Sequence, residues 1–214
     1  AKELLRALRN CKARWACQVS IDAAEDPELL DLMAETGCMG QLIGFDANDA
    51  SALRWMRKKP NVHSFTRYAR LIERLRSYGF QTWASFIVGG DFDTPETIQD
   101  TVRFAIENKF TLAFFHILQP YPGTDLYRQL EQERRLLYDG KWWLHPDFHY
   151  NASTFLPKHL SPQELGDAVV WANQKFYSIR SIVSRSLDYK TNMSSVVKLA
   201  IHARLNMLIR QTST

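Results

Sequence analysis

The chain has 214 residues, of which 45% are hydrophobic and 23% charged, and its formal net charge is +4. This composition is typical of a globular protein with a sizeable core and excludes a low-complexity chain. No apolar run approaches the roughly 20 residues that a membrane-spanning helix needs. The opening residues, AKELLRALRN, predict a helix already under way rather than a signal peptide, so we expect a piece cut from a longer protein.

The three cysteines, Cys11, Cys17 and Cys38, have spacings of 6 and 21 and match neither a disulfide framework nor a zinc or haem pattern. We therefore expect free thiols in a reducing cytoplasm. Charge is unevenly placed, because seven Lys or Arg but only one acid, Asp188, follow Gln174. This basic tail is either a solvated helix face or a site of contact with a membrane surface or a lipid-like anionic substrate.

Hydrophobic periodicity predicts four helix–strand pairs in the first 118 residues and a further helix after them. The predicted helices span Lys2–Asn10, Pro27–Thr36, Ser64–Tyr78, Pro95–Asn108 and Asp125–Arg135. The predicted strands span Arg14–Asp22, Met39–Asp46, Trp83–Val88 and Thr111–Leu118. Residues 47–61 are expected to form a loop and a polar stretch. Such alternation predicts parallel strands joined by right-handed crossovers, with all four carboxyl ends on one side.

Glycines, carboxylates or amides accompany the end of each predicted strand. In the first strand, Gln18, Ser20 and Asp22 form a polar row on one face. The third strand runs into Gly89-Gly90, and glycines there would let a cofactor approach the backbone. Because α/β folds bind ligands at the carboxyl ends of parallel strands, we expect the site at this end.

The chain changes character after Leu137. Tyr138–Phe155 is rich in Trp, His and Tyr without a clear period, and we expect an irregular segment lying across the body. A capping-box pattern that starts at Ser161 predicts a helix to about Ile182, and a last helix is predicted over Ser194–Ile209. We therefore divide the chain into 1–137, 138–160 and 161–214.

Familiar catalytic patterns are scarce. The six histidines lack metal-ligand spacing, so we expect no metal site within this chain. His116 is either a core histidine or a proton donor that reaches the barrel lumen. No nucleophile elbow or phosphate loop occurs, and basic and aromatic residues do not interleave, so we expect no nucleic-acid partner. A complete hydrolase or isomerase using Asp22, Asp46 and Asp91 is a weaker alternative, because it has no nucleophile.

Four motifs in order resemble a known family. QVSID (18–22), GFD (44–46), FIVGGDFDTPE (86–96) and LQPYPGTDLY (118–127), with the helix start LSPQEL (160–165), resemble the C-terminal part of a radical S-adenosylmethionine (radical SAM) enzyme. The subgroup is the one that carries a cobalamin-binding domain ahead of the radical domain. The resemblance implies an α/β fold, a partial (β/α) TIM-like barrel fragment followed by a C-terminal helical extension.

The resemblance also implies a site. In the full-length protein the lumen would hold a 4Fe-4S cluster and S-adenosylmethionine (SAM), whose cleavage yields a 5′-deoxyadenosyl radical that abstracts hydrogen from a small-molecule substrate; cobalamin is a further cofactor that the subgroup allows. The first-strand row would line the lumen, the second strand end would approach the ribose or methionyl part, the third would pack on the adenine, and the residues after the fourth would close the far wall. The implied cofactor-binding residues are Gln18, Ser20, Asp22, Gly44, Asp46, Ile87, Gly89, Gly90, Asp93, Gln119 and Tyr121.

The cysteines depart from the family pattern. The family binds its cluster through C-x-x-x-C-x-x-C, and Cys11, Cys17 and Cys38 cannot replace that motif. The resemblance therefore implies the back half of an oxidoreductase or methyltransferase-like enzyme that is inactive alone. The alternative is a non-catalytic half-barrel that serves as a binding or scaffold module. An open half-barrel exposes two sheet edges and the apolar face of its strands, so we expect either self-association or strained, partly disordered ends.

Overall fold

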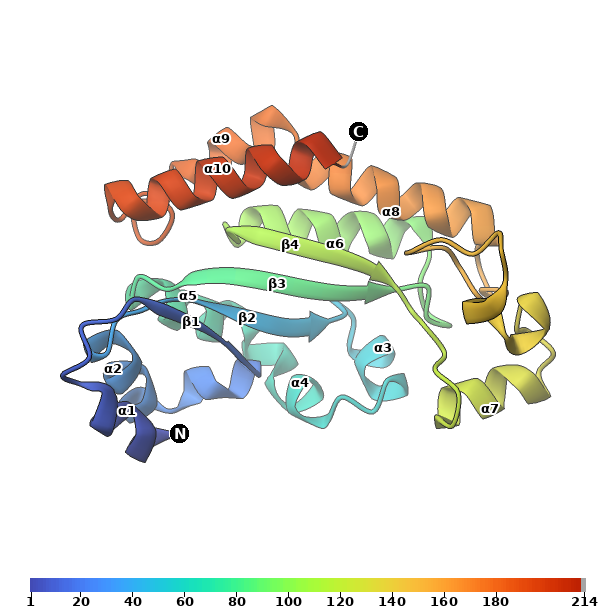
Figure 1. The fold of residues 1–214 in the computed structure, drawn as a ribbon, viewed down its shortest axis with the longest axis horizontal. Coiled ribbons are helices and arrows are strands. Elements are labelled where there is room, and N and C mark those ends of the chain that lie inside the picture. The colour runs from blue at the N-terminus through green and yellow to red at the C-terminus, as the bar shows by residue number, and fades with distance from the viewer. Residues whose placement is uncertain (213–214) are drawn as a thin grey trace.

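The computed structural model describes residues 1–212 as an open parallel sheet with helices along one face and one edge (Figure 1). The strand order is β1-β2-β3-β4, and neighbouring strands are parallel. The strands are β1 (Trp15–Val19), β2 (Cys38–Asp46), β3 (Gln81–Val88) and β4 (Leu112–Ile117). The predicted α/β class with four parallel strands is confirmed.

The helices connect the strands and extend the chain beyond β4. They are α1 (Lys2–Leu8), α2 (Pro27–Glu35), α3 (Ala50–Trp55), α4 (Lys59–Ser64), α5 (Tyr68–Ser77), α6 (Pro95–Glu107), α7 (Asp125–Gln132), α8 (Pro162–Phe176), α9 (Ile179–Ser186) and α10 (Val196–Thr212). Short 3₁₀ helices span Ile21–Glu25, Phe65–Arg67, Tyr138–Gly140 and Trp142–Leu144. None of the helices described is long and apolar enough to cross a bilayer.

The two faces of the sheet differ in burial. On the helix-covered face, the rings of Phe45, Phe86 and Phe115 stack across three strands, with centroids 5.9 and 5.6 Å apart. On the other face, register pairs such as Leu42 with Trp83 are only partly buried. This second face corresponds to the lumen of a barrel, because no helix of the described chain covers it (Figure 1).

Side chains from the C-terminal part bond the free edge of β4. The Tyr177 hydroxyl donates to the Ala113 carbonyl at 2.9 Å, and the Asn151 amide oxygen accepts from the Ile117 N–H at 2.9 Å. Arg185 donates to the Thr111 carbonyl at 3.0 Å. The expectation of two exposed edges is wrong for most of β4, because the outward backbone groups of Ala113 and Ile117, and the Thr111 carbonyl before them, already have partners. Self-association of the chain stays a prediction, and β1 is the edge left for it.

Three predicted elements needed correction in the first 80 residues. The first strand ends at Val19 rather than Asp22, because the chain turns into a 3₁₀ helix that buries Ile21 completely. The expected loop over 47–61 contains α3 and the first half of α4, and the Asp49 carboxylate caps α3 by accepting from the Ala52 N–H. The helix predicted over Ser64–Tyr78 is therefore the end of α4, a 3₁₀ turn and α5.

The C-terminal helix predicted to reach Ile182 is two helices. α8 ends at Phe176, and Ser178 caps α9 by accepting from the Ser181 N–H. The break places the Tyr177 hydroxyl on β4, as described above. α8 contributes Leu165 and Phe176 to the same hydrophobic core as the sheet. The boundaries at 137/138 and 160/161 stay predictions.

Candidate functional site

Two cavities meet at the carboxyl ends of β3 and β4. The first, about 360 Å³, lies between the α3–α4 connection and α7, and we call it the α7 cavity. The second, about 460 Å³, lies against the uncovered face of β3 and β4 and under the 142–151 segment, and we call it the aromatic cavity. Ile87 and Leu118 line both, so the two cavities are neighbours. This is the side on which the sequence predicted a site.

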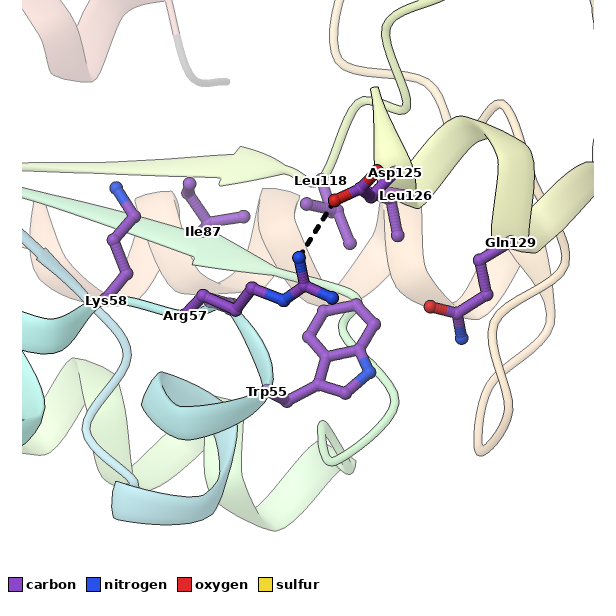
Figure 2. A pocket seen from close by; sticks show the side chains of 9 residues that line it. Trp55, Arg57, Lys58, Ile87, Leu118, Asp125, Leu126 and Gln129 are labelled. Carbon is purple, nitrogen blue, oxygen red and sulfur yellow. Dashed lines mark hydrogen bonds and ion pairs between the residues drawn. The ribbon is translucent and has the colours of Figure 1, made fainter. Parts of the chain in front are cut away.

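The α7 cavity combines flat apolar walls with a polar rim. Figure 2 shows the Trp55 indole near the Arg57 guanidinium, with Leu118 and Leu126 beyond. Arg57 forms an ion pair with Asp125 at 2.8 Å, and both side chains are mostly exposed. An exposed pair of this kind adds little stability, so a ligand could displace it at low cost.

Aromatic side chains of the irregular segment form the roof of the second cavity. The Trp142 ring lies 4.8 Å from that of Phe148 and 6.0 Å from that of Tyr121, measured between centroids. The Trp142 indole N–H is buried and has no hydrogen-bond partner among the described residues. An unpaired buried donor beside a cavity suits a ligand that brings an acceptor.

His116 lies on the opposite wall of the aromatic cavity. Its Nδ1 and the Tyr150 hydroxyl are hydrogen-bonded, 3.2 Å apart. Burial lowers the pKa of His116, so the imidazole is neutral at pH 7. Because His116 lines the aromatic cavity on the uncovered face, the prediction that its side chain reaches the barrel lumen is confirmed, whereas its role as a proton donor stays a prediction. The described lining of this cavity includes no Asp, Glu, Lys or Arg side chain, so the cavity suits an uncharged group.

The turn after β3 is organised by its own residues. The N–H groups of Gly89 and Gly90 both donate to the Asp93 carboxylate at 2.8 Å, and burial raises the Asp93 pKa. Gly89 has φ +98°, and a Cβ there would lie 2.6 Å from a methyl carbon of Leu165 on α8. The structure thus explains Gly89 by helix packing and Asp93 by loop closure. A contact between this turn and a cofactor stays a prediction. Gly90 is the glycine of the turn that lies against Trp55, a residue of the α7 cavity.

The end of β2 is also held internally. Asp46 has φ +63°, is buried and lies 3.1 Å from the ammonium of Lys58, a residue that lines the α7 cavity. The Asn61 amide donates to the Gly44 carbonyl at 2.8 Å. Gly44 pairs in register with Ser85, which places it on the uncovered face near the aromatic cavity.

The polar row of the first strand is only partly formed. Gln18 lies on the uncovered face in register with Leu42 and is exposed. Ser20 and Asp22 lie beyond the strand, where the Ser20 hydroxyl donates to the Asp22 carboxylate. The expectation that all three share one strand face is wrong for Ser20 and Asp22, because β1 ends at Val19 and the chain turns there into a 3₁₀ helix.

The residues after β4 occupy the predicted wall. Gln119 and Tyr121 both line the aromatic cavity. The Gln119 amide donates to the Ala152 carbonyl at 3.0 Å and accepts from the Thr154 hydroxyl at 2.9 Å. It therefore fixes the segment that carries the aromatic roof.

Asp91 holds the two ends of the aromatic segment, because its ion-pair partners Arg135 and Lys158 precede and follow that segment in the chain. It is buried between Arg135 at 2.8 Å and Lys158 at 2.7 Å. Burial alone would raise the pKa of Asp91, but the bonds from these two cations outweigh it and hold the pKa below its ordinary value. Asp22, Asp46 and Asp91 each have a partner of their own, so nothing in the described structure supports an acid–base group built from them.

Sequence reasoning missed much of both cavities. Trp55, Asp125 and Gln129 were not singled out, although the cap residue Asp49 was a signal for the helix that positions Trp55. The composition of Tyr138–Phe155 identified the aromatic segment as a whole, but it did not indicate which rings face the cavity.

An open parallel β/α sheet with cavities at the carboxyl ends of its strands defines a barrel-type, ligand-binding α/β protein. Residues 1–105 match the sequence profile of the Radical SAM superfamily. The fold agrees with this match. It aligns with the radical S-adenosylmethionine methyltransferase TsrM from Kitasatospora setae, solved with cobalamin and a [4Fe-4S] cluster bound, at a TM-score of 0.59 and 18% identity over 83% of this chain and 39% of that one. The chain thus resembles radical SAM proteins in the sequence of residues 1–105 and in the fold of most of its length, and the expected partial barrel is confirmed.

Two curated relatives match most of the chain. Bacteriochlorophyllide d C-12(1)-methyltransferase of Chlorobaculum tepidum is 26% identical over 86% of this chain and 38% of its own length. Anaerobic magnesium-protoporphyrin IX monomethyl ester cyclase of Cereibacter sphaeroides is 27% identical over 80% of this chain and 27% of its own length. The chain thus spans well under half the length of these relatives.

Proposed function

We propose that this chain is the cofactor- and substrate-facing half of a cytoplasmic radical SAM enzyme, similar to the methyltransferases of that superfamily. The observation that carries the proposal is the pair of adjoining cavities at the carboxyl ends of β3 and β4. The match of residues 1–105 to the Radical SAM superfamily supports the chemistry, and the similarity to a methyltransferase over 86% of the chain supports the reaction type. Three free thiols suit a reducing compartment.

The residues of the α7 cavity fit SAM. Trp55, Ile87 and Leu118 offer flat apolar walls for an adenine ring, and Gln129 offers both a donor and an acceptor at the rim. When bound beside the cluster, SAM supplies a reactive 5′-deoxyadenosyl group. The part of this chain is to bind the nucleoside and to exclude water from one side of it.

The residues present do not fit the iron–sulfur cluster. Cys17 and Cys38 lie on β1 and β2 and contribute to the core side of the sheet, whereas Cys11 is exposed. Among the described residues no group of three or more His, Cys, Asp or Glu is arranged to hold a metal ion. We therefore propose that the cluster, and cobalamin if the enzyme uses it, are held by other parts of the longer protein, and that this chain alone is inactive.

The aromatic cavity suits the substrate. It offers ring surfaces and no charged side chain, with the Trp142 N–H as a free donor and neutral His116 on the facing wall. An uncharged apolar or planar group with one acceptor oxygen or nitrogen matches that lining.

Substitution at the wall shared by both cavities tests the proposal in the full-length protein. Ile87→Asn places a polar amide in both cavities, and we expect SAM affinity measured by equilibrium dialysis to fall about tenfold or more. Val170→Asn on the exposed side of α8 is the matched control, with unchanged affinity. Equal affinities of the two variants, both folded by circular dichroism, would contradict the placement of SAM.

The absence of cluster thiolates favours one other function, a non-catalytic half-barrel that binds a ligand. In that case the full-length protein would bind SAM or another small molecule without taking up iron. Iron content after anaerobic reconstitution separates the two readings.

A further inference from the structure

The C-terminal helices carry an apolar outer surface. Eleven of the eighteen large hydrophobic side chains that are exposed in the described structure follow Ala168. We call them the C-terminal surface, and they are Val170, Trp171, Ile179, Val183, Leu187, Tyr189, Met193, Val196, Val197, Met207 and Leu208. Exposed apolar groups scattered singly are normal, but a concentration of this kind marks an interaction surface.

The exposed groups are densest at the turn between α9 and α10. Leu187 is 64% exposed, Tyr189 71% and Val196 85%. On α9, Ile179 and Val183 precede Leu187 at intervals of four residues, so they share one helix face. α9, the turn and α10 thus present an apolar outer side along the top of the molecule (Figure 1).

The exposed charges that residues 168–212 themselves carry are all positive, although Glu73 of α5 pairs with Lys190 of the turn, and Glu164 and Asp167 of α8 lie near Trp171. Asp188 is the sole carboxylate between residues 168 and 212, and it is buried against Arg76 at 2.9 Å. Lys175, Arg180 and Arg204 are exposed on α8, α9 and α10. A partner that complements exposed apolar side chains, in a segment whose own exposed charges are cations, is itself apolar and anionic.

Completion of the barrel does not account for this surface. α8 and α10 lie along β4, and Tyr177, Arg185 and Asn151 bond its outer edge at Ala113, Thr111 and Ile117. Further strands can therefore join only at β1, on the opposite edge of the sheet. The C-terminal surface stays uncovered when the sheet is extended.

We propose that α9, the turn 187–195 and α10 dock in the interface of an anionic lipid bilayer. Amphipathic helices bind such interfaces by burying apolar side chains at the headgroup boundary while Lys and Arg contact anionic headgroups. The cavities lie at the carboxyl ends of the strands and the α9–α10 turn near their amino ends, so the docked protein keeps both cavities open (Figure 1). The inference is independent of the radical chemistry.

Vesicle flotation of the purified 1–214 chain tests the proposal. We expect the chain to float with vesicles of phosphatidylcholine and phosphatidylglycerol, to float poorly with phosphatidylcholine alone, and to be released by high salt. Arg180→Gln with Arg204→Gln should weaken binding about fivefold for each cation removed. Leu187→Ser with Val196→Ser should weaken binding by a further tenfold or more, because two apolar anchors are lost.

The matched control is Leu4→Ser, which removes an equally exposed leucine from α1 and should leave flotation unchanged. Circular dichroism of each variant shows that it is folded. Flotation independent of lipid charge, or equally affected by Leu4→Ser, would overturn the proposal. The proposal would also be overturned if light scattering showed a dimer that Leu187→Ser with Val196→Ser dissociates, because a second copy of the chain would then cover the C-terminal surface.

Discussion

Arg185 is the buried cation that joins the C-terminal helices to the sheet. Its guanidinium donates to the carbonyls of Phe110 at 2.9 Å and Phe176 at 2.9 Å, and also to Thr111, Ser181 and Asn206. It lies 3.8 Å from the Phe176 ring centroid. Burial lowers the pKa of Arg185 to about 9, which is still above neutral, so the group is charged at pH 7.

Arg185→Met removes these bonds without leaving a large void. The Thr111 carbonyl keeps the Asn206 amide at 2.9 Å, but the Phe110 and Phe176 carbonyls lose the donors described here. At about 2 kcal/mol for each unpaired buried acceptor, we expect a loss of about 4 kcal/mol of unfolding free energy. Arg185→Lys keeps the charge with fewer donors and should lose about 2 kcal/mol.

Urea denaturation followed by tryptophan fluorescence measures both losses. Arg180→Met, an exposed arginine on the same helix, is the control and should change stability by less than about 0.5 kcal/mol. If Arg185→Met were as stable as Arg180→Met, the hydrogen bonds of Arg185 would contribute no net stability beyond the cost of burying its charge. The assignment of Arg185 as the link between α9 and β4 would then be refuted.

Three further predictions concern the packing, the pH dependence and the cavity. Gly89→Ala should lower the free energy of unfolding by about 3 kcal/mol, because φ is +98° and the new methyl group meets Leu165. Gly123→Ala, at φ +84° in open space, is the control and should lower it by about 1 kcal/mol. Equal losses by urea denaturation would contradict the packing role of Gly89. Burial lowers the pKa of His202 to about 4, so its contribution to unfolding free energy is complete above pH 6.5 and is lost as pH falls toward 4, by about 1.4 kcal/mol per pH unit at most. His202→Gln should flatten that slope in urea titrations, and an unchanged slope would show that other groups cause it. In the full-length protein, Trp142→Phe keeps an aromatic wall but removes the free N–H, and it should lower product formation about tenfold by chromatographic assay; an equal effect of Trp143→Phe, whose side chain is partly exposed, would point to a general aromatic requirement.

The sequence predicted the sheet well because its signals are local. Alternating and β-branched runs predicted the four strands, and the helix predicted to begin at Pro95 does begin there as α6. Predictions were poorer where tertiary contacts outweigh local pattern. The first strand stops early because Ile21 is drawn into the core, and the C-terminal helix breaks where the Tyr177 hydroxyl bonds β4.

The candidate site was predicted by position more than by role. Ile87, Gln119 and Tyr121 do line cavities, since residues at the carboxyl ends of parallel strands converge. Gly89 and Asp93 carry signals that a packing glycine and a loop-closing carboxylate share with ligand-binding groups. The aromatic roof depends on bonds from Asn151 and Gln119 across more than 30 residues, which no local pattern contains.

The central claim is that this chain forms the cofactor-facing half of a radical SAM barrel. It is tested most directly by anaerobic iron–sulfur reconstitution of the full-length protein and by measuring 5′-deoxyadenosine released from SAM under reductant. We expect release that depends on a cysteine triplet outside residues 1–214 and that falls when Ile87 is replaced by Asn. A full-length protein that takes up no iron and releases no 5′-deoxyadenosine would contradict the claim and leave a binding module.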